Sequence, residues 1–129
     1  LTVLFEDGFD PTKAHPVDPD DLRPPRGVCL VARDQGVLVG TGSLKPSGPD
    51  AGYIKRMWVA PEARGTGLGK RLLAELEARA LELGYAAVRL ETKRELTRAI
   101  AMYRKHGYLE IERFNEELYG DFWFEKRLT

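Results

Sequence analysis

The feature of this sequence that most restricts its fold is a glycine-rich turn between an apolar strand and an amphipathic helix. Residues 64–69 read RGTGLG, with a strand-like stretch at 53–59 before them and leucines at helical spacing after them. Glycines at alternate positions ahead of a helix expose backbone N–H groups at a terminus that carries about half a positive charge. The turn therefore predicts a binding site for an anion such as pyrophosphate.

Two common phosphate motifs do not fit this turn. A dinucleotide fingerprint that begins at Gly65 needs a glycine at position 70, where the chain has Lys70. A Walker A loop that ends in Gly69-Lys70 needs glycine at position 64 and Ser or Thr at position 71, and arginine occupies both. The pattern that remains is Arg64-x-x-Gly67-x-Gly69 after a strand.

Length and charge limit the classes of function. The 129 residues suit one domain, residues 1–129, and the apolar fraction of 43% with a charged fraction of 31% indicates a globular chain. Twenty basic residues balance twenty acidic ones, which argues against a nucleic-acid coat or a polybasic membrane anchor. No apolar run approaches the ~18 residues of a membrane span. We therefore expect neither nucleic acid nor membrane as a partner.

The single cysteine and the start of the sequence bear on the compartment. Cys29 is the only cysteine, so it cannot form an internal disulfide. Because it lies within an apolar run, we expect it to be a small, buried core residue. For the protein we expect a reducing, cytoplasmic compartment. No secretory signal pattern begins the sequence as given. Position 1 is Leu, so residues can be missing upstream of it.

The N-terminal part of the chain reads as irregular structure followed by a hairpin. Residues 1–27 hold five of the eight prolines and are predicted to be extended or looped, with one short helical turn. They would form either a wall of a substrate pocket or a plain surface wrap. Apolar runs at 28–33 and 37–44 around a short glycine-containing turn predict a β-hairpin, and composition predicts a loop at 45–52.

The remainder predicts a strand–helix–strand unit and a final antiparallel pair. In the strand 53–59, strict alternation would place on opposite faces the sets Tyr53, Lys55, Met57, Val59 and Ile54, Arg56, Trp58. A helix from 68 to 83 and a strand at 86–91 complete a right-handed crossover, so the two strands should be parallel. A helix at 95–106 and antiparallel strands at 108–114 and 121–128 follow. The pattern predicts an α/β fold with a mixed sheet.

A second motif, AIAMYRKHGY at residues 99–108, carries a tyrosine on a helix shortly before a glycine–aromatic pair. Together with Arg64-x-x-Gly67-x-Gly69, this motif resembles the GNAT family of N-acetyltransferases, and the likeness covers residues 53–109. Residues flanking the first motif also agree: Val59, Pro61, Leu68, Leu72 and Leu73. The resemblance implies the acyl-CoA N-acyltransferase fold, in which two central parallel strands splay apart between antiparallel hairpins.

The resemblance also implies acetyl-CoA as the cofactor. It assigns the cofactor to three groups of residues: Met57, Trp58 and Val59 on the strand; Arg64, Gly65, Thr66, Gly67, Leu68, Gly69, Lys70 and Arg71 around the pyrophosphate; and Thr92, Leu96, Ala99, Tyr103 and Lys105 at and along the second helix. Arg104 is an alternative to Lys105 for the ribose phosphate. Position 96 departs from the family, which often has a polar residue there, so Leu96 would replace that contact by packing.

The resemblance assigns the role of general acid to Tyr103, which would protonate the departing thiolate. The transfer from a phenol to a thiolate is uphill by only about 2 kcal/mol. In isolation, a tyrosine at this position would more often be an interior residue with a satisfied hydroxyl, and the motif around Tyr103 is what favours the acid. Glu91 is the candidate base for the amine, and the other interpretation is a structural carboxylate paired with Arg56 or Arg94. No metal site is predicted.

The sequence thus favours an N-acetyltransferase that transfers the acetyl group of acetyl-CoA to an amine of a small molecule or protein. A non-catalytic acyl-CoA-binding or regulatory domain on the same scaffold is the alternative. An unrelated α/β nucleotide binder would require both motif matches to be accidental. Lys55, Arg56 and Arg113 are candidates to attract a carboxylate of the acceptor, whose identity stays open. A homodimer through sheet edges or C-terminal strands is common in the family.

Overall fold

The computed structural model describes residues 3–8, 23–118 and 120–129, which form a mixed sheet with helices on one face. The strands are β1 (Val3–Asp7), β2 (Val28–Asp34), β3 (Val37–Ser47), β4 (Ala51–Val59), β5 (Ala87–Thr92), β6 (Leu109–Ile111) and β7 (Phe122–Arg127). The helices are η3 (Pro61–Ala63, a 3₁₀ turn), α1 (Leu68–Glu82) and α2 (Thr97–Lys105). None of the helices in the described ranges is long and apolar enough to cross a membrane.

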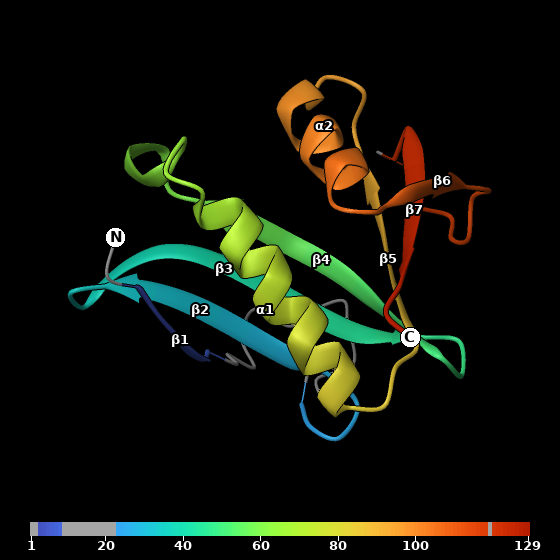
Figure 1. Cartoon of the computed structure of the whole chain (residues 1–129), viewed down its shortest axis with the longest axis horizontal. Helices are drawn as coiled ribbons and strands as arrows, with labels where there is room; N and C mark the ends of the chain where they lie inside the picture. Colours follow the sequence, from blue (N-terminus) through green and yellow to red (C-terminus); the bar gives the residue numbers. More distant parts are fainter. Residues whose placement is uncertain (1–2, 9–22, 119) are drawn as a thin grey trace.

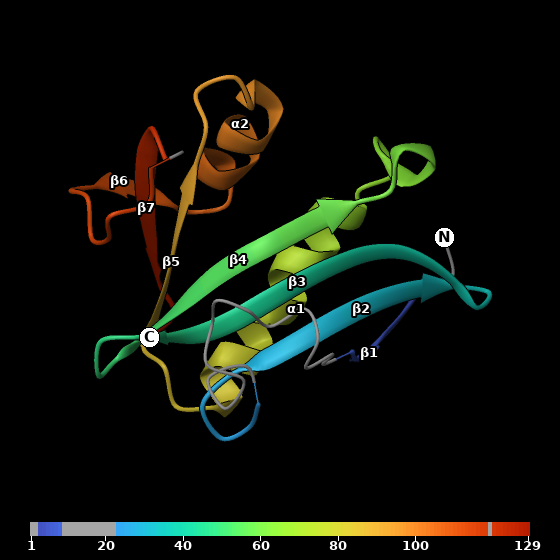
Figure 2. The same ribbon diagram turned by 180° about the vertical axis from the view of Figure 1, so that it is seen from behind.

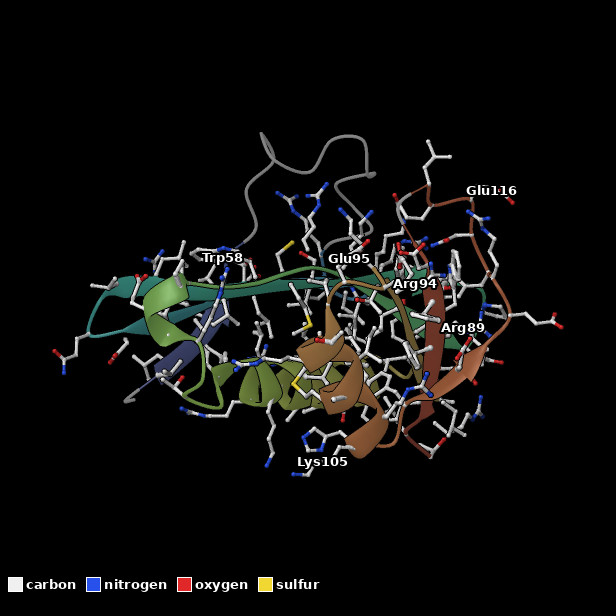
Figure 3. All side chains as sticks on the ribbon, turned by 90° about the horizontal axis from the view of Figure 1, so that it is seen from above. Trp58, Arg89, Arg94, Glu95, Lys105 and Glu116 are labelled. Atoms are coloured by element: carbon white, nitrogen blue, oxygen red, sulfur yellow. The ribbon has the colours of Figure 1, made fainter. Side chains whose placement is uncertain are left out.

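The sheet has two antiparallel parts that meet at one parallel pair. The strand order is β1-β2-β3-β4-β5-β7-β6, and β4 with β5 is the parallel pair. Helix α1 covers β2, β3 and β4, and α2 lies on the β5 side of the molecule (Figure 1). Figure 3 shows both helices on the same face of the sheet. The prediction of parallel strands joined by a crossover helix is confirmed.

Strands β4 and β5 are hydrogen-bonded only over a short segment and then separate. Only Ala51–Tyr53 of β4 pairs with residues 87–89 of β5. Beyond that point the two strands diverge, so their carboxyl ends lie at the wide end of an opening (Figure 2). This confirms the expectation of central splayed parallel strands with antiparallel hairpins on either side.

Leucines at helical spacing attach α1 to the sheet. Leu72, Leu73 and Leu76 are almost fully buried and pack against residues of β2, β3 and β4. Burying each such side chain contributes about 1.5–3 kcal/mol. The helix approaches β3 so closely that a Cβ on Gly42 would lie 2.8 Å from Leu76. The predicted amphipathic helix is confirmed, and its close contact depends on glycine in the strand beneath it.

A β-bulge at Arg56 breaks the alternation predicted for β4. Arg56 has a φ of 57°, and the register jumps from Ser43 opposite Lys55 to Thr41 opposite Trp58. Two residues of β4 thus oppose one of β3, which reverses the facing of the residues that follow. Ile54 and Met57 therefore pack into the same core, and the predicted strict alternation is wrong beyond Arg56.

The start of the N-terminal segment, which composition predicted as irregular, forms a strand. Val3–Asp7 is strand β1, antiparallel to β2, so the prediction of an irregular N-terminus is wrong at its start. The apolar residues there precede the prolines that dominated the prediction. The helical turn and pocket wall expected further on fall largely on residues 9–22, outside the described residues.

The loop predicted at 45–52 is reduced to a tight turn. Strand β3 continues to Ser47 and β4 begins at Ala51, with Pro46 opposite Gly52. Prolines and glycines favour a loop by local propensity, but cross-strand pairing and packing outweigh that preference here.

Contrary to the prediction, Cys29 does not lie in the core. Val28, Leu30 and Ala32 are the buried side chains of β2, and Cys29 is half-buried on the opposite face, with Sγ 3.4 Å from Oγ of Ser43. Burial raises the pKa of its thiol. The alternation of a strand decides the facing, which an apolar run alone does not reveal.

A polar clamp joins α1 to the C-terminal half. The hydroxyl of Tyr108 and the ammonium of Lys126 each donate a hydrogen bond of 2.8 Å to the carboxylate of Glu77. Tyr108 is fully buried, so loss of the acceptor would leave its hydroxyl unsatisfied. Because an orphaned buried donor and a broken, partly buried ion pair both destabilise, we expect Glu77→Ala to lower the free energy of unfolding by about 2–3 kcal/mol.

Urea unfolding followed by circular dichroism measures this effect. Glu82→Ala is the matched control, because Glu82 is exposed in the last turn of the same helix and its loss should change stability by less than about 0.5 kcal/mol. Equal midpoints for the two variants would mean that the clamp contributes nothing.

Candidate functional site

The glycine turn holds its shape through backbone conformation and one short side-chain bond. Gly65 and Gly67 have φ of 79° and 85°, in the left-handed region that favours glycine. The hydroxyl of Thr66 donates to the carbonyl of Ala63 at 2.5 Å. A Cβ on Gly65 or Gly67 would meet nothing within 4 Å, so the turn needs these glycines for their φ and not for lack of space.

Helix α1 begins at this turn without a side-chain cap. Gly67 is its N-cap, and the first turn carries no acidic residue and no capping hydrogen bond from a side chain of the described residues. The first N–H groups of a helix have no partner within the helix itself. Those of α1 therefore stay available to an anion, with the positive end of the helix dipole behind them.

A cavity of about 740 Å³ lies between this turn, the end of β4 and the start of α2. It brings together most of the predicted cofactor residues: Met57, Trp58, Val59, Arg64, Gly65, Gly67, Leu68, Gly69, Lys70, Leu96 and Ala99. We call it the donor cleft. The side chain of Arg64 lines this cleft, and its Nε donates a hydrogen bond of 3.2 Å to the carbonyl of Val59.

Sequence reasoning missed several residues of the donor cleft: Ala63, Glu95, Thr97, Arg98 and Met102. Met102 could have been found, because it follows Ala99 by three residues and so shares its helix face. The predicted second helix begins at Glu95, but α2 begins at Thr97 and Glu95 lies in the segment before it. Its side chain and that of Arg94 are labelled in Figure 3.

Three predicted cofactor residues line neither this cleft nor the second cavity described below. Thr66 bonds within the turn, and the guanidinium of Arg71 lies 5.7 Å from the ring centroid of Phe5. Lys105 ends α2 on the opposite side of the molecule from Trp58 (Figure 3). The alternative cation, Arg104, pairs with Glu110 at 3.2 Å.

A second, smaller cavity of about 310 Å³ adjoins the donor cleft, and Met57 and Leu96 line both. We call it the acceptor pocket. It contains the remaining predicted residues, Glu91, Thr92 and Tyr103. The two cavities therefore meet between β4 and the start of α2, and the candidate acid and base both lie on the far side of that junction from the glycine turn.

Tyr103 is packed among aromatic rings and lines the acceptor pocket. Its ring packs against those of Tyr108 and Phe124, with centroids 5.6 and 6.1 Å apart. Among the described residues, no group accepts a hydrogen bond from the hydroxyl of Tyr103. Burial raises the pKa of this phenol, so the protonated form persists at neutral pH. Because no buried side-chain N or O atom of the described residues lacks a hydrogen-bond partner, the hydroxyl of Tyr103 is open to the acceptor pocket.

Glu91 is oriented by a tyrosine of the neighbouring strand. The hydroxyl of Tyr53 donates to Oε1 of Glu91, and the Tyr53 ring meets Phe114 edge-on at 5.5 Å. Burial and then the adjacent Glu91 raise the pKa of Tyr53, so it remains a donor. The guanidinium of Arg94, one partner considered above, lies over the ring of Phe122 instead.

The divergence of the strands exposes one edge of β4 to the cavities. Beyond Tyr53 this edge has no neighbouring strand, because pairing with β5 stops there. Unpaired N–H and C=O groups along a strand can pair with an extended ligand that carries amides. The edge runs from the acceptor pocket towards the glycine turn and so connects both parts of the site.

Comparisons with known proteins agree with this geometry. Residues 2–108 match the model of the acetyltransferase (GNAT) family. An Azospirillum brasilense protein named IAA acetyltransferase is 40% identical over 98 residues, which cover 74% of this chain and 63% of that protein. The chain spans 51–63% of the length of the first curated relatives it matches.

Solved structures extend the likeness over the whole chain. A Klebsiella pneumoniae protein described as an acyl-CoA N-acyltransferase is 31% identical, with 99% of both chains covered and a TM-score of 0.80. A GNAT family acetyltransferase from Elizabethkingia anophelis with acetyl-CoA bound has a TM-score of 0.73 over 97% of both chains. At 17% identity this second likeness shows the fold alone. The motifs, the splayed sheet and these matches together place the chain in the GNAT family of acetyltransferases.

Proposed function

We propose that this chain binds acetyl-CoA and transfers its acetyl group to the amine of a small molecule or protein. The observation that carries the proposal is the junction of two cavities at Met57 and Leu96, one leading to an uncapped helix N-terminus and the other to Tyr103 and Glu91. A phosphate-binding end and an acid–base end, connected through an exposed strand edge, suit a thioester donor and an amine acceptor.

The residues of the donor cleft fit the parts of acetyl-CoA. The N–H groups at the start of α1, with the cations of Arg64 and Lys70, suit the pyrophosphate. The unpaired edge of β4 at Met57 and Val59 suits the amides of the pantetheine arm. Leu96 supplies an apolar wall where the family often has a polar contact.

Acetyl transfer from a thioester to an amine requires two proton transfers that involve residues of this chain. The acceptor nitrogen forms a bond to the carbonyl carbon, and the carbon–sulfur bond breaks. Glu91, oriented by Tyr53, takes the proton lost by the amine, directly or through water. Tyr103, kept protonated by burial, gives a proton to the departing thiolate. A neutral amine loses one proton to Glu91 and the thiolate gains one from Tyr103, and return of the Glu91 proton to the Tyr103 phenolate through solvent restores both groups. An acceptor that arrives as an ammonium ion first releases one further proton to solvent.

Two measurements test the proposal with the chain as it stands. Isothermal calorimetry should show binding of acetyl-CoA and CoA, and none of ATP or NAD. A thiol-release assay over a panel of amines should then show acceptor-dependent liberation of CoA. Binding without release for any amine would favour the non-catalytic acyl-CoA-binding domain. Absence of CoA binding would contradict both.

A further inference from the structure

The acceptor pocket is small and strongly charged. At about 310 Å³ it lies at the low end of the range for small-molecule sites. Three cationic side chains and two carboxylates line it: Lys55, Arg56, Lys93, Glu91 and Glu117. A pocket that must accept an ammonium-bearing molecule would not be expected to contain an excess of positive charge, because like charges repel at short range.

The positive charges concentrate beside Tyr53. The ammonium groups of Lys55 and Lys45 lie 5.4 and 5.9 Å from the centroid of the Tyr53 ring, and Arg56 follows Lys55 in β4. Burial lowers the pKa of Lys55, and Lys45 and Arg56 lower it further, against smaller opposing effects of Glu91 and Glu117. An anion arriving here would therefore relieve an unfavourable concentration of charge.

The negative charges lie on other elements of the same pocket. Glu91 belongs to β5, and its Oε1 accepts from Tyr53. Glu117 belongs to the segment between β6 and β7, where its backbone carbonyl accepts a hydrogen bond of 2.8 Å from Arg113. The pocket thus presents Lys55 and Arg56 on β4, Glu91 on β5, Glu117 on this segment and a third cation, Lys93, directly after β5. Groups of both signs on facing strands are the charge arrangement of a site for a molecule with both signs.

We propose that the acceptor is a small zwitterion, an amino acid or a close analogue, whose ammonium group lies towards Glu91 and whose carboxylate lies against Lys55 and Arg56. This rests on the proposed acetyl transfer. A diamine would place a second cation against Lys55. A lysine side chain of a protein carries no carboxylate to place against Lys55 and Arg56.

The test compares matched acceptors in the thiol-release assay with saturating acetyl-CoA. Each set holds an amino acid, its carboxamide and its decarboxylated amine, for example leucine, leucinamide and 3-methylbutylamine. We expect kcat/KM for the amino acid to exceed that for both partners by about 10- to 100-fold, as for a charge-assisted contact. Preference over the carboxamide opposes intrinsic reactivity, because a carboxamide leaves more of the amine neutral than a carboxylate does.

Variants of Lys55 identify the group that recognises the carboxylate. Lys55→Gln should raise KM for the amino acid about tenfold and leave kcat/KM for the decarboxylated amine no lower than in the parent chain, because a repelling positive charge is removed, whereas Lys55→Arg should retain the preference. Arg127→Gln is the control for loss of one positive charge, because Arg127 is exposed at the end of β7 and lines neither cavity. It should behave as the parent chain.

The possible outcomes distinguish failure of the zwitterion proposal from failure of the proposed acetyl transfer. No thiol release with any acceptor would overturn the proposed function. Release that is equal or faster with carboxamides and decarboxylated amines would overturn the zwitterion alone and leave acetyl transfer standing. An amino acid preference that survives in Lys55→Gln would overturn the role of Lys55 in binding the carboxylate.

Discussion

Replacement of Tyr103 by phenylalanine should lower kcat by about 100-fold or more and change acetyl-CoA affinity by less than about threefold. The hydroxyl faces the acceptor pocket without a hydrogen-bond acceptor among the described residues, so its removal costs little in the resting protein. Its proton is needed only as the carbon–sulfur bond breaks. Single-turnover thiol release measures the loss, and calorimetry measures the affinity.

Tyr108→Phe is the matched control for this experiment. Its ring packs against that of Tyr103 at 5.6 Å, but its hydroxyl donates to Glu77 and lines neither cavity. That variant should be less stable and turn over normally. If both variants keep the kcat of the parent chain, Tyr103 is not the acid.

The second large effect concerns the turn that begins α1. Gly67→Val should weaken acetyl-CoA binding by about 100-fold or more. A β-branched residue at a φ of 85° is strained by about 1–3 kcal/mol, and the turn would relieve that strain by moving the N–H groups that face the donor cleft. The added side chain meets no protein atom within 4 Å of its Cβ, so the variant should still fold.

Gly36→Val provides a control with nearly identical strain. Gly36 has a φ of 84° in the β2–β3 turn and also has open space around it, but it lies outside both cavities. Calorimetry and thermal unfolding of both variants separate the two effects, because both should lose similar stability and only Gly67→Val should lose affinity. Normal binding by Gly67→Val would place the pyrophosphate elsewhere.

Features with a strong local cause could be predicted from the sequence. The left-handed glycines and the leucine spacing of residues 68–83 define the turn and α1, and a strand–helix–strand unit of this length has one preferred hand. The parallel pair therefore followed, whereas the opening between its strands was implied only by the resemblance to the GNAT family. Leu96 and Ala99 likewise reach one cleft because helical spacing places them on one face.

Features that depend on tertiary contacts could not be predicted from the sequence. Nothing about Arg56 marks it for a positive φ, yet its bulge decides which residues of β4 enter the core. The partner of Glu91 is Tyr53, which lies 38 residues earlier and meets it only because β4 and β5 are neighbours. Lys105 and Arg71 have the charge expected of phosphate ligands, but side-chain direction is set by packing that the sequence does not state.

The divergence of β4 and β5 also bears on the fate of the folded chain. Hydrogen bonds of the sheet are missing along the opening, so an extended ligand lying there would act as a substitute strand and tie the two parts of the molecule together. Any ligand that binds only the native state raises its free energy of unfolding in proportion to the logarithm of its concentration. Scarcity of the donor would then do more than slow turnover, because the empty protein would open more often and be cleaved sooner by cellular proteases.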